Sequence, residues 1–155
     1  MKTKTINIYS YKELEGKAKE RAKNWLIEAD DMAIDWECMQ EDAKTIGLKL
    51  TGIDDYKAEG ELILDFSKVL ANIIKEHGES CDTYKTAKEY QEKYLKLTED
   101  QEEEKEELEG DFLKAILEDY RILWRKEVEY HYSDEYIDEM MEANEYEFNI
   151  DGKIV

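Results

Sequence analysis

The chain has 155 residues, with 41 Asp or Glu and 22 Lys or Arg, and its formal net charge is −19. This length favours a single domain spanning residues 1–155; no apolar run approaches the ~18 residues of a transmembrane helix, and residues 1–10 lack the apolar core of a secretory signal. The acidic excess argues against direct binding to nucleic acid or to an anionic membrane, because Lys and Arg supply the affinity for phosphate.

Strand and helix patterns alternate at the start of the chain. Thr and Ile alternate with polar residues near 3–9, which predicts a short strand. Ser10 and Glu13 have the spacing of a capping box, which predicts that a helix starts there. A second helix is expected after Asp30 and Asp31, with Met32 on its apolar stripe and Gly47 as its C-cap.

A hairpin and a short helix are predicted next. Residues 48–53 and 61–64 alternate apolar and polar side chains and predict two antiparallel strands with a longer connection between them. An apolar stripe that begins at Phe66 predicts a helix, which stops near Gly78.

The second half of the chain is dominated by helix patterns. Residues 82–132 predict a long helical hairpin, and the apolar stripe of its second helix, residues 111–131, covers more than half of the circumference. Such a wide stripe indicates burial against more than one neighbour. The acidic stretch 98–110 inside this hairpin is interpreted either as an internal linker or as a helix turn, since Thr98 begins another capping-box spacing.

The end of the chain returns to strand patterns. A helix is predicted to restart after Ser133, and the alternation of residues 146–150 predicts a last strand, followed by a tight turn at Asp151–Gly152. This strand is expected to pair with the first strand or with the hairpin. The fold class predicted is therefore α+β, a small antiparallel β-sheet covered by helices.

Negative charge is concentrated in the second half, which has a net charge of −15 against −4 for residues 1–78. Helices can align such acids in rows, since neighbours three and four residues apart lie on one face. Two rows are predicted as a partner-binding acidic face: Glu99, Glu102, Glu103, Glu106, Glu107, Glu109, and then Asp134, Glu135, Asp138, Glu139 and Glu142. The competing interpretation is a solvated surface that keeps the protein soluble.

The sequence offers no recognisable catalytic or metal motif. Gly78 interrupts the spacing between His77 and Cys81, and no Cys-x-x-Cys or Glu-x-x-His motif occurs. Cys38 is expected to be a small buried hydrophobe. We therefore expect no enzyme activity, no cofactor and no metal site.

Tyrosine is the other unusual feature, because eight of the eleven tyrosines lie in the acidic half. Tyrosine is enriched at interface hot spots. Tyr130, Tyr132 and Tyr136 are predicted as aromatic partner-binding residues. Packing within the helical hairpin is the alternative for about half of the eight, since a tyrosine ring can be buried while its hydroxyl reaches water.

Several stretches resemble a family of small acidic proteins encoded by bacteriophages and prophages. The resemblance is carried by residues 41–49, 76–87, 117–123, 142–148 and 151–153. It implies an accessory phage protein that acts in the cytoplasm of a bacterial host, and many such proteins counter host defence. Tract 99–109 looks like a variable linker in that pattern, and no catalytic residue can be carried over.

The charge and the resemblance together predict a non-enzymatic inhibitor. It would bind a nucleic-acid-binding host protein, such as a CRISPR effector or a restriction enzyme, through an acidic face that mimics DNA. The alternative is an antitoxin-like or structural phage protein that binds its partner through the apolar and aromatic face of helix 111–131. That broad face also favours a homodimer.

Overall fold

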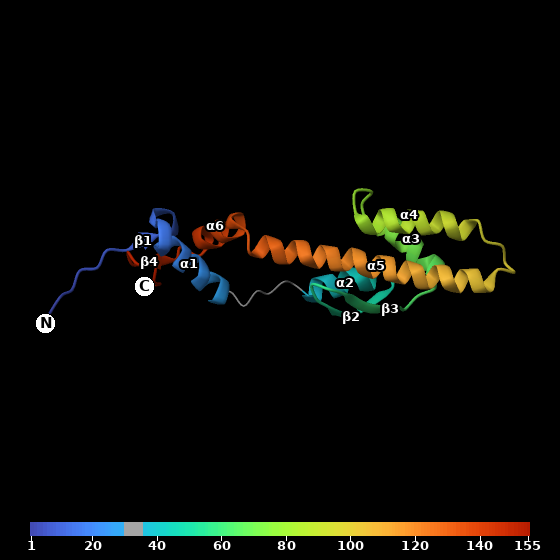
Figure 1. Cartoon of the computed structure of the whole chain (residues 1–155), viewed down its shortest axis with the longest axis horizontal. Helices are drawn as coiled ribbons and strands as arrows, with labels where there is room; N and C mark the ends of the chain where they lie inside the picture. The colour runs from blue at the N-terminus through green and yellow to red at the C-terminus, as the bar shows by residue number, and fades with distance from the viewer. Residues whose placement is uncertain (30–35) are drawn as a thin grey trace. The chain divides into compact units, whose positions relative to one another are not determined.

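The computed structural model describes residues 1–29 and 36–155, which form two compact units (Figure 1). Unit 1 contains residues 1–29 and 127–155, and unit 2 contains residues 36–126. Helices dominate both units, and each has one two-stranded antiparallel sheet, so the α+β fold class is confirmed. The prediction that the whole chain is one domain stays a prediction.

Unit 2 contains a hairpin and four helices. Its elements in chain order are α2 (Trp36–Ile46), β2 (Leu48–Ile53), β3 (Ala58–Leu62), α3 (Phe66–Glu76), α4 (Asp82–Leu95) and most of α5 (Glu102–His131). Gly47 ends α2 with φ of 91°, a left-handed conformation that suits glycine, so this predicted C-cap is confirmed. Met32, predicted on the stripe of this helix, lies outside the described residues.

The β2–β3 hairpin closes earlier than the sequence pattern indicated. Asp54 accepts hydrogen bonds from the backbone N–H groups of Tyr56 and Lys57, at 2.7 and 2.8 Å, which completes the turn. The second strand therefore begins at Ala58, three residues before the predicted 61–64. Leu62 pairs with Leu48, and the two residues after Leu62 lie outside the strand.

The predicted helical hairpin 82–132 is present as α4 and α5 (Figure 1). Three contacts show that the two helices are antiparallel. Residues further along α4 contact residues closer to the start of α5. The contacts join Asp82 to Lys126, Thr86 to Asp119 and Tyr90 to Phe112. Of the acidic stretch 98–110, residues 102–110 form the first turns of α5.

The apolar stripe of α5 is buried against several elements of unit 2, as its width predicted. Phe112, Ile116 and Tyr120 are fully buried. The aromatic contacts reach three other helices, at centroid distances of 5.1 Å for Phe112 and Phe66, 5.5 Å for Phe112 and Tyr90, and 6.2 Å for Trp124 and Trp36. Little of this stripe is left for a partner.

Unit 1 contains both chain ends. Its elements are β1 (Tyr9–Ser10), the 3₁₀ turn η1 (Tyr11–Glu13), α1 (Gly16–Ala29), the end of α5, α6 (Asp134–Ala143) and β4 (Glu147–Phe148). Strand β1 pairs with β4, with Tyr9 opposite Phe148, so of the two partners predicted for the last strand it pairs with the first strand and not with the hairpin. The hairpin forms a separate sheet in unit 2, where the prediction had a single sheet.

The strands of unit 1 are shorter than the patterns near 3–9 and 146–150 indicated. A strand needs a partner along its length, and after Phe148 the chain turns back at Asp151–Gly152 so that Ile154 bridges to Phe148. Residues before Tyr9 therefore have no strand opposite them in the described chain. The capping-box contact is also present, since Ser10 N–H donates to Glu13 at 2.7 Å, but it closes η1, and α1 starts later.

Candidate functional site

The first candidate site is a row of acids in the turn before α5 and in the first turns of that helix. We call Glu99, Glu102, Glu103, Glu106, Glu107 and Glu109 the acidic row. All six are exposed, and within the described part of the chain none of them forms an ion pair. The acidic row is therefore not neutralised by neighbouring lysines.

Helix geometry divides the acidic row between two sides of α5. Glu102, Glu106 and Glu109 line a shallow pocket of about 400 Å³, together with Asp65 at the start of α3. Successive residues are rotated by about 100° around a helix. Glu103 and Glu107 therefore lie on the side of α5 away from the buried face, and the row wraps around the helix.

The second predicted row lies on α6, in unit 1, and it is partly neutralised. Asp134 accepts a hydrogen bond from Lys23 Nζ at 2.7 Å, which lowers the pKa of Asp134. Glu139 accepts a hydrogen bond from the Tyr130 hydroxyl at 3.0 Å, and this bond raises the pKa of Tyr130. The two rows belong to different units, so we treat them separately.

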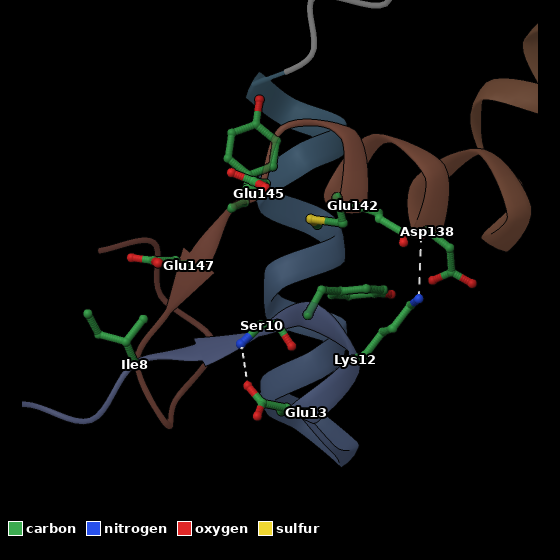
Figure 2. Close-up of a pocket in the computed structure, with 11 residues that line it drawn as sticks. Ile8, Ser10, Lys12, Glu13, Asp138, Glu142, Glu145 and Glu147 are labelled. Carbon is green, nitrogen blue, oxygen red and sulfur yellow. Dashed lines mark hydrogen bonds and ion pairs between the residues drawn. The ribbon is translucent and has the colours of Figure 1, made fainter.

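Two α6 acids of that row line an acidic pocket of unit 1, which has a volume of about 590 Å³ (Figure 2). We call it the unit 1 pocket. The charged residues that line it are Lys12, Glu13, Asp138, Glu142, Glu145 and Glu147. Five carboxylates and one ammonium group give these residues a net charge of −4. Tyr11 and Met141 provide a buried apolar part of the lining.

Of the acids that line this pocket, only Asp138 and Glu142 were predicted from the sequence as partner-binding residues. Glu13, Glu145 and Glu147 were missed, because these residues come from separate segments that the β1–β4 pairing brings together. One signal was present in the sequence. Glu145 and Glu147 flank Tyr146, and such i and i+2 acids would lie on one side of an extended chain. Glu145 is in fact in a turn, with a left-handed φ of 51°, so this pattern alone would not have placed it.

The three predicted partner-binding tyrosines lie together in unit 1. Tyr130 and Tyr132 are exposed at the junction of α5 and α6, whereas Tyr136 is half-buried. The Tyr136 ring contacts Tyr130 at 5.5 Å and His131 at 4.5 Å between centroids. Tyr130, His131 and Tyr136 thus form an aromatic cluster, and Tyr132 is an exposed neighbour of it along the chain.

A polar network in unit 2 connects α2, α3, α4 and α5. Asp42 accepts a hydrogen bond from the Tyr120 hydroxyl at 2.8 Å, and its carboxylate lies 3.4 Å from His77 Nε2. His77 Nδ1 shares a hydrogen bond with buried Thr83 at 2.6 Å. His77 Nε2 is buried and has no hydrogen-bond partner. Because Thr83 is closed to solvent, we interpret this Asp–His–Thr arrangement as structural.

The network makes stability depend on pH through Asp42. Contact with His77 lowers the pKa of Asp42 most, burial opposes this, and the Tyr120 hydroxyl lowers it further. A folded-state pKa below the unfolded value of ~3.9 stabilises the fold above that value, and this stabilisation is lost as the pH falls through the folded pKa.

Asp42→Asn is therefore expected to destabilise unit 2 at pH 7 by about 1 kcal/mol, a modest value because Asp42 is half-exposed and screened. Its stability should also fall less steeply than that of the wild type below pH 4. Urea unfolding at several pH values measures both effects. Tyr120→Phe is the matched variant, and additive losses in the double variant would contradict coupling between the two residues.

Neither a metal site nor a membrane span is found in the described residues. Residues 1–29 and 36–155 contain no group of three His, Cys, Asp or Glu side chains placed to hold a metal ion. In the same ranges, no helix is both long and apolar enough to cross a membrane. Cys38 is exposed, so the expectation that it is buried was wrong, because the position lies on the outer side of α2.

Comparisons with known proteins add no relative. The chain matches no protein-family model, no curated protein and no solved structure. We therefore infer function from the geometry of the acidic row and of the unit 1 pocket.

Proposed function

We propose that this protein is a non-enzymatic inhibitor of the phage anti-defence type, which binds a nucleic-acid-binding host protein through the acidic row of α5. The acids would occupy the basic channel that otherwise holds DNA or RNA. A CRISPR effector or a restriction enzyme is the expected class of target. Such a protein would act in the cytoplasm of the bacterial host.

The observation that carries this proposal is the density of unpaired charge on the first turns of α5. Between Glu102 and Glu109 there are six carboxylates and Lys105, a net charge of −5. At ~1.5 Å per residue this segment is about 11 Å long. Duplex DNA carries about six charges over the same length, at one per ~1.7 Å. The two charge densities are similar.

Rigidity supports the same interpretation. The acidic row continues directly into the part of α5 that is anchored in the core by Phe112 and Ile116. Charges on an anchored helix lose less conformational entropy when they bind than charges on a loose linker do. A preformed row of acids is therefore suited to compete with DNA.

The alternative function, through the apolar face of helix 111–131, is favoured less. Phe112, Ile116 and Tyr120 of that face are buried within unit 2, and Leu123 and Tyr130 are the large apolar side chains that the helix exposes. A docking surface for an antitoxin-like contact or a homodimer would need a larger exposed apolar patch.

Neutralising the acidic row is expected to abolish inhibition. The test variant carries Glu102→Gln, Glu103→Gln, Glu106→Gln and Glu107→Gln, which keep side-chain size and helix propensity. Expressed in bacteria that carry a CRISPR or restriction system, the wild-type protein should raise the plaque count of a targeted phage, and the variant should not. Binding to the captured effector should fall between about 50 and 200 mM salt and should be reversed by added duplex DNA.

A matched control separates the acidic row from net charge. Glu15→Gln, Glu20→Gln, Glu28→Gln and Glu37→Gln remove the same charge at exposed positions outside α5. This control should inhibit like the wild type. Equal loss in both variants would contradict the proposal, and so would a pull-down in which no nucleic-acid-binding protein is enriched at any salt concentration.

A further inference from the structure

Residues 3–8 have a strand pattern that the rest of the chain leaves unpaired. They contain no proline, no glycine and no acid. In the structure they precede β1, they form no backbone hydrogen bond with another described residue, and Ile6 and Ile8 are 55% and 47% exposed. In Figure 1 this segment runs away from the other elements of unit 1. Unpaired backbone groups in a β-prone segment form a template for pairing with another chain.

Strand β1 lies at the edge of its two-stranded sheet, and the hydrogen-bond pattern shows which of its backbone groups face outward. Glu147 on β4 accepts a hydrogen bond from the Val155 N–H at 3.0 Å, so its backbone polar groups point away from β1. These groups alternate in direction along an antiparallel strand, so Phe148 and Tyr9 are the pair that exchanges hydrogen bonds. The backbone groups of Ile8 therefore point to the free edge, and so do those of the even-numbered residues before it when the strand is continued.

We propose that residues 4–9 of two copies of this chain pair antiparallel along the free edge of β1, so that the two β1–β4 sheets join across a two-fold axis. Such an interface uses the same segment twice. It needs even-numbered residues opposite even-numbered residues, because only their backbone groups face the edge. The interface lies in unit 1 and uses neither the acidic row nor the face of helix 111–131, so it does not depend on the function proposed above.

The side chains select the pairing that is centred on Asn7. This pairing puts Ile6 of each copy opposite Ile8 of the other, which gathers the exposed isoleucines of both copies on one face of the joined sheet. On the other face it puts Thr5 opposite Tyr9, and a β-branched residue beside an aromatic ring is a favoured cross-strand pair. A shift of the pairing by two residues in either direction would place a polar residue opposite an isoleucine.

Charge complementarity favours a second copy as the partner. Residues 1–12 contain three lysines and no acid, whereas residues 127–155 contain ten acids and one lysine. The lysine-bearing segment of one copy therefore meets the acidic part of unit 1 in the other. Two chains of charge −19 also repel each other. At ~0.15 M salt the screening length is ~8 Å, so this long-range repulsion is screened while contacts across the interface persist.

Lys4 is the residue that this complementarity concerns most. In the pairing centred on Asn7, Lys4 of one copy lies opposite Ser10 of the other, whose side chain is too short to block it. Ser10 lies next to two exposed acids, because its N–H donates to Glu13 at 2.7 Å and Glu147 is its partner on β4. Neither acid forms an ion pair within the described part of its own chain, so both are available to the Lys4 ammonium group.

Sedimentation velocity over a range of protein concentrations, at ~0.15 M salt, tests the proposal. The wild-type protein should change from monomer to dimer as its concentration rises, with the weak affinity of a small interface. Ile6→Pro removes an N–H group that faces the edge and should lower the association constant about tenfold or more. Thr5→Pro is the matched control, because the N–H of Thr5 points away from the partner strand, and this variant should dimerise nearly like the wild type. Monomers at every concentration, or equal losses in the two variants, would overturn the proposal.

Disulfide cross-linking tests the register of the pairing. Asn7 faces its counterpart across the two-fold axis as a non-hydrogen-bonded pair, whose Cα atoms lie ~4.5 Å apart, within the range that a disulfide bridges. In a chain with Cys38→Ser and Cys81→Ser, Asn7→Cys should therefore form a linked dimer under mild oxidation. Thr3→Cys should do so at least about tenfold more slowly, since it lies about eight residues, or ~26 Å, from its counterpart. Equal rates would indicate chance collisions of a loose segment and would refute the pairing.

Discussion

Phe112→Ala is expected to destabilise unit 2 by about 3–5 kcal/mol, the usual loss when a fully buried aromatic side chain is truncated. The Phe112 ring is inaccessible to solvent and lies between Phe66 on α3 and Tyr90 on α4, at centroid distances of 5.1 and 5.5 Å. Its removal leaves a cavity between three helices that cannot collapse without moving α5. Urea unfolding followed by circular dichroism measures the loss.

The same substitution should also loosen the acidic row. Phe112 is the first fully buried side chain on α5, one turn after Glu109. Amide hydrogen exchange of residues 102–111 should therefore accelerate in Phe112→Ala more than that of α6, because α6 belongs to the other unit. If exchange increased equally in both segments, Phe112 would not be the specific anchor of the row.

Gly110→Ala is the matched control on the same helix. A Cβ added at Gly110 would meet no atom within 4 Å, and the position lies in the interior of α5. Alanine there should stabilise the helix by about 0.5–1 kcal/mol. If Gly110→Ala raises the free energy of unfolding and Phe112→Ala lowers it, then the loss in Phe112→Ala comes from packing and not from a general sensitivity of α5. A destabilised Gly110→Ala variant would contradict this.

Long helices and the glycine residues that end them could be predicted from the sequence, because both depend on neighbouring residues. The apolar repeat through Phe112, Ile116 and Tyr120 predicted both α5 and its burial, and the same side chains are fully buried in the structure. Gly47 was predicted as a C-cap from its place after an apolar stripe, and it has the required positive φ. These signals depend on a few neighbouring residues, so the sequence carries them directly.

Strand boundaries could not be predicted, because they depend on partners elsewhere in the chain. The alternation near residues 3–9 is that of a strand, yet only Tyr9 and Ser10 find a partner in β4. The Asp54 side chain decides where the hairpin turns, and a strand pattern contains no information on that contact.

The candidate sites also differ in whether they depend on neighbouring residues or on distant parts of the chain. The exposure of Glu103 and Glu107 follows from the helix period, so sequence reasoning could predict it. Glu102, Glu106 and Glu109 face the side of α3 and are exposed because they precede Phe112, the first buried residue of α5. The unit 1 pocket could not be predicted, since Glu13 is more than a hundred positions away from Glu142 and Glu147 in the chain. Only the pairing of β1 with β4 brings the two ends together.

That pairing depends on Gly152, and Gly152→Ala is expected to destabilise unit 1 by at least about 2 kcal/mol. Gly152 has φ of 81°, and a Cβ at this position would overlap the backbone carbonyl oxygen of Ala18 on α1. Arg21 also holds this turn, because its guanidinium donates to the Asp151 carbonyl at 3.1 Å. The substitution must therefore push the turn away from α1 and strain the bridge between Phe148 and Ile154.

Gly16→Ala separates the backbone strain from the steric contact. Gly16 has φ of 56°, but a Cβ there would meet no atom within 4 Å. Gly16→Ala should lower the free energy of unfolding by about 1–2 kcal/mol, because alanine is strained in the left-handed conformation. Thermal unfolding compares the two variants, and amide exchange of residues 147–155 should rise strongly only in Gly152→Ala. Equal losses and equal exchange would mean that contact with Ala18 does not hold the C-terminal turn, and therefore does not support the Glu147 side of the unit 1 pocket.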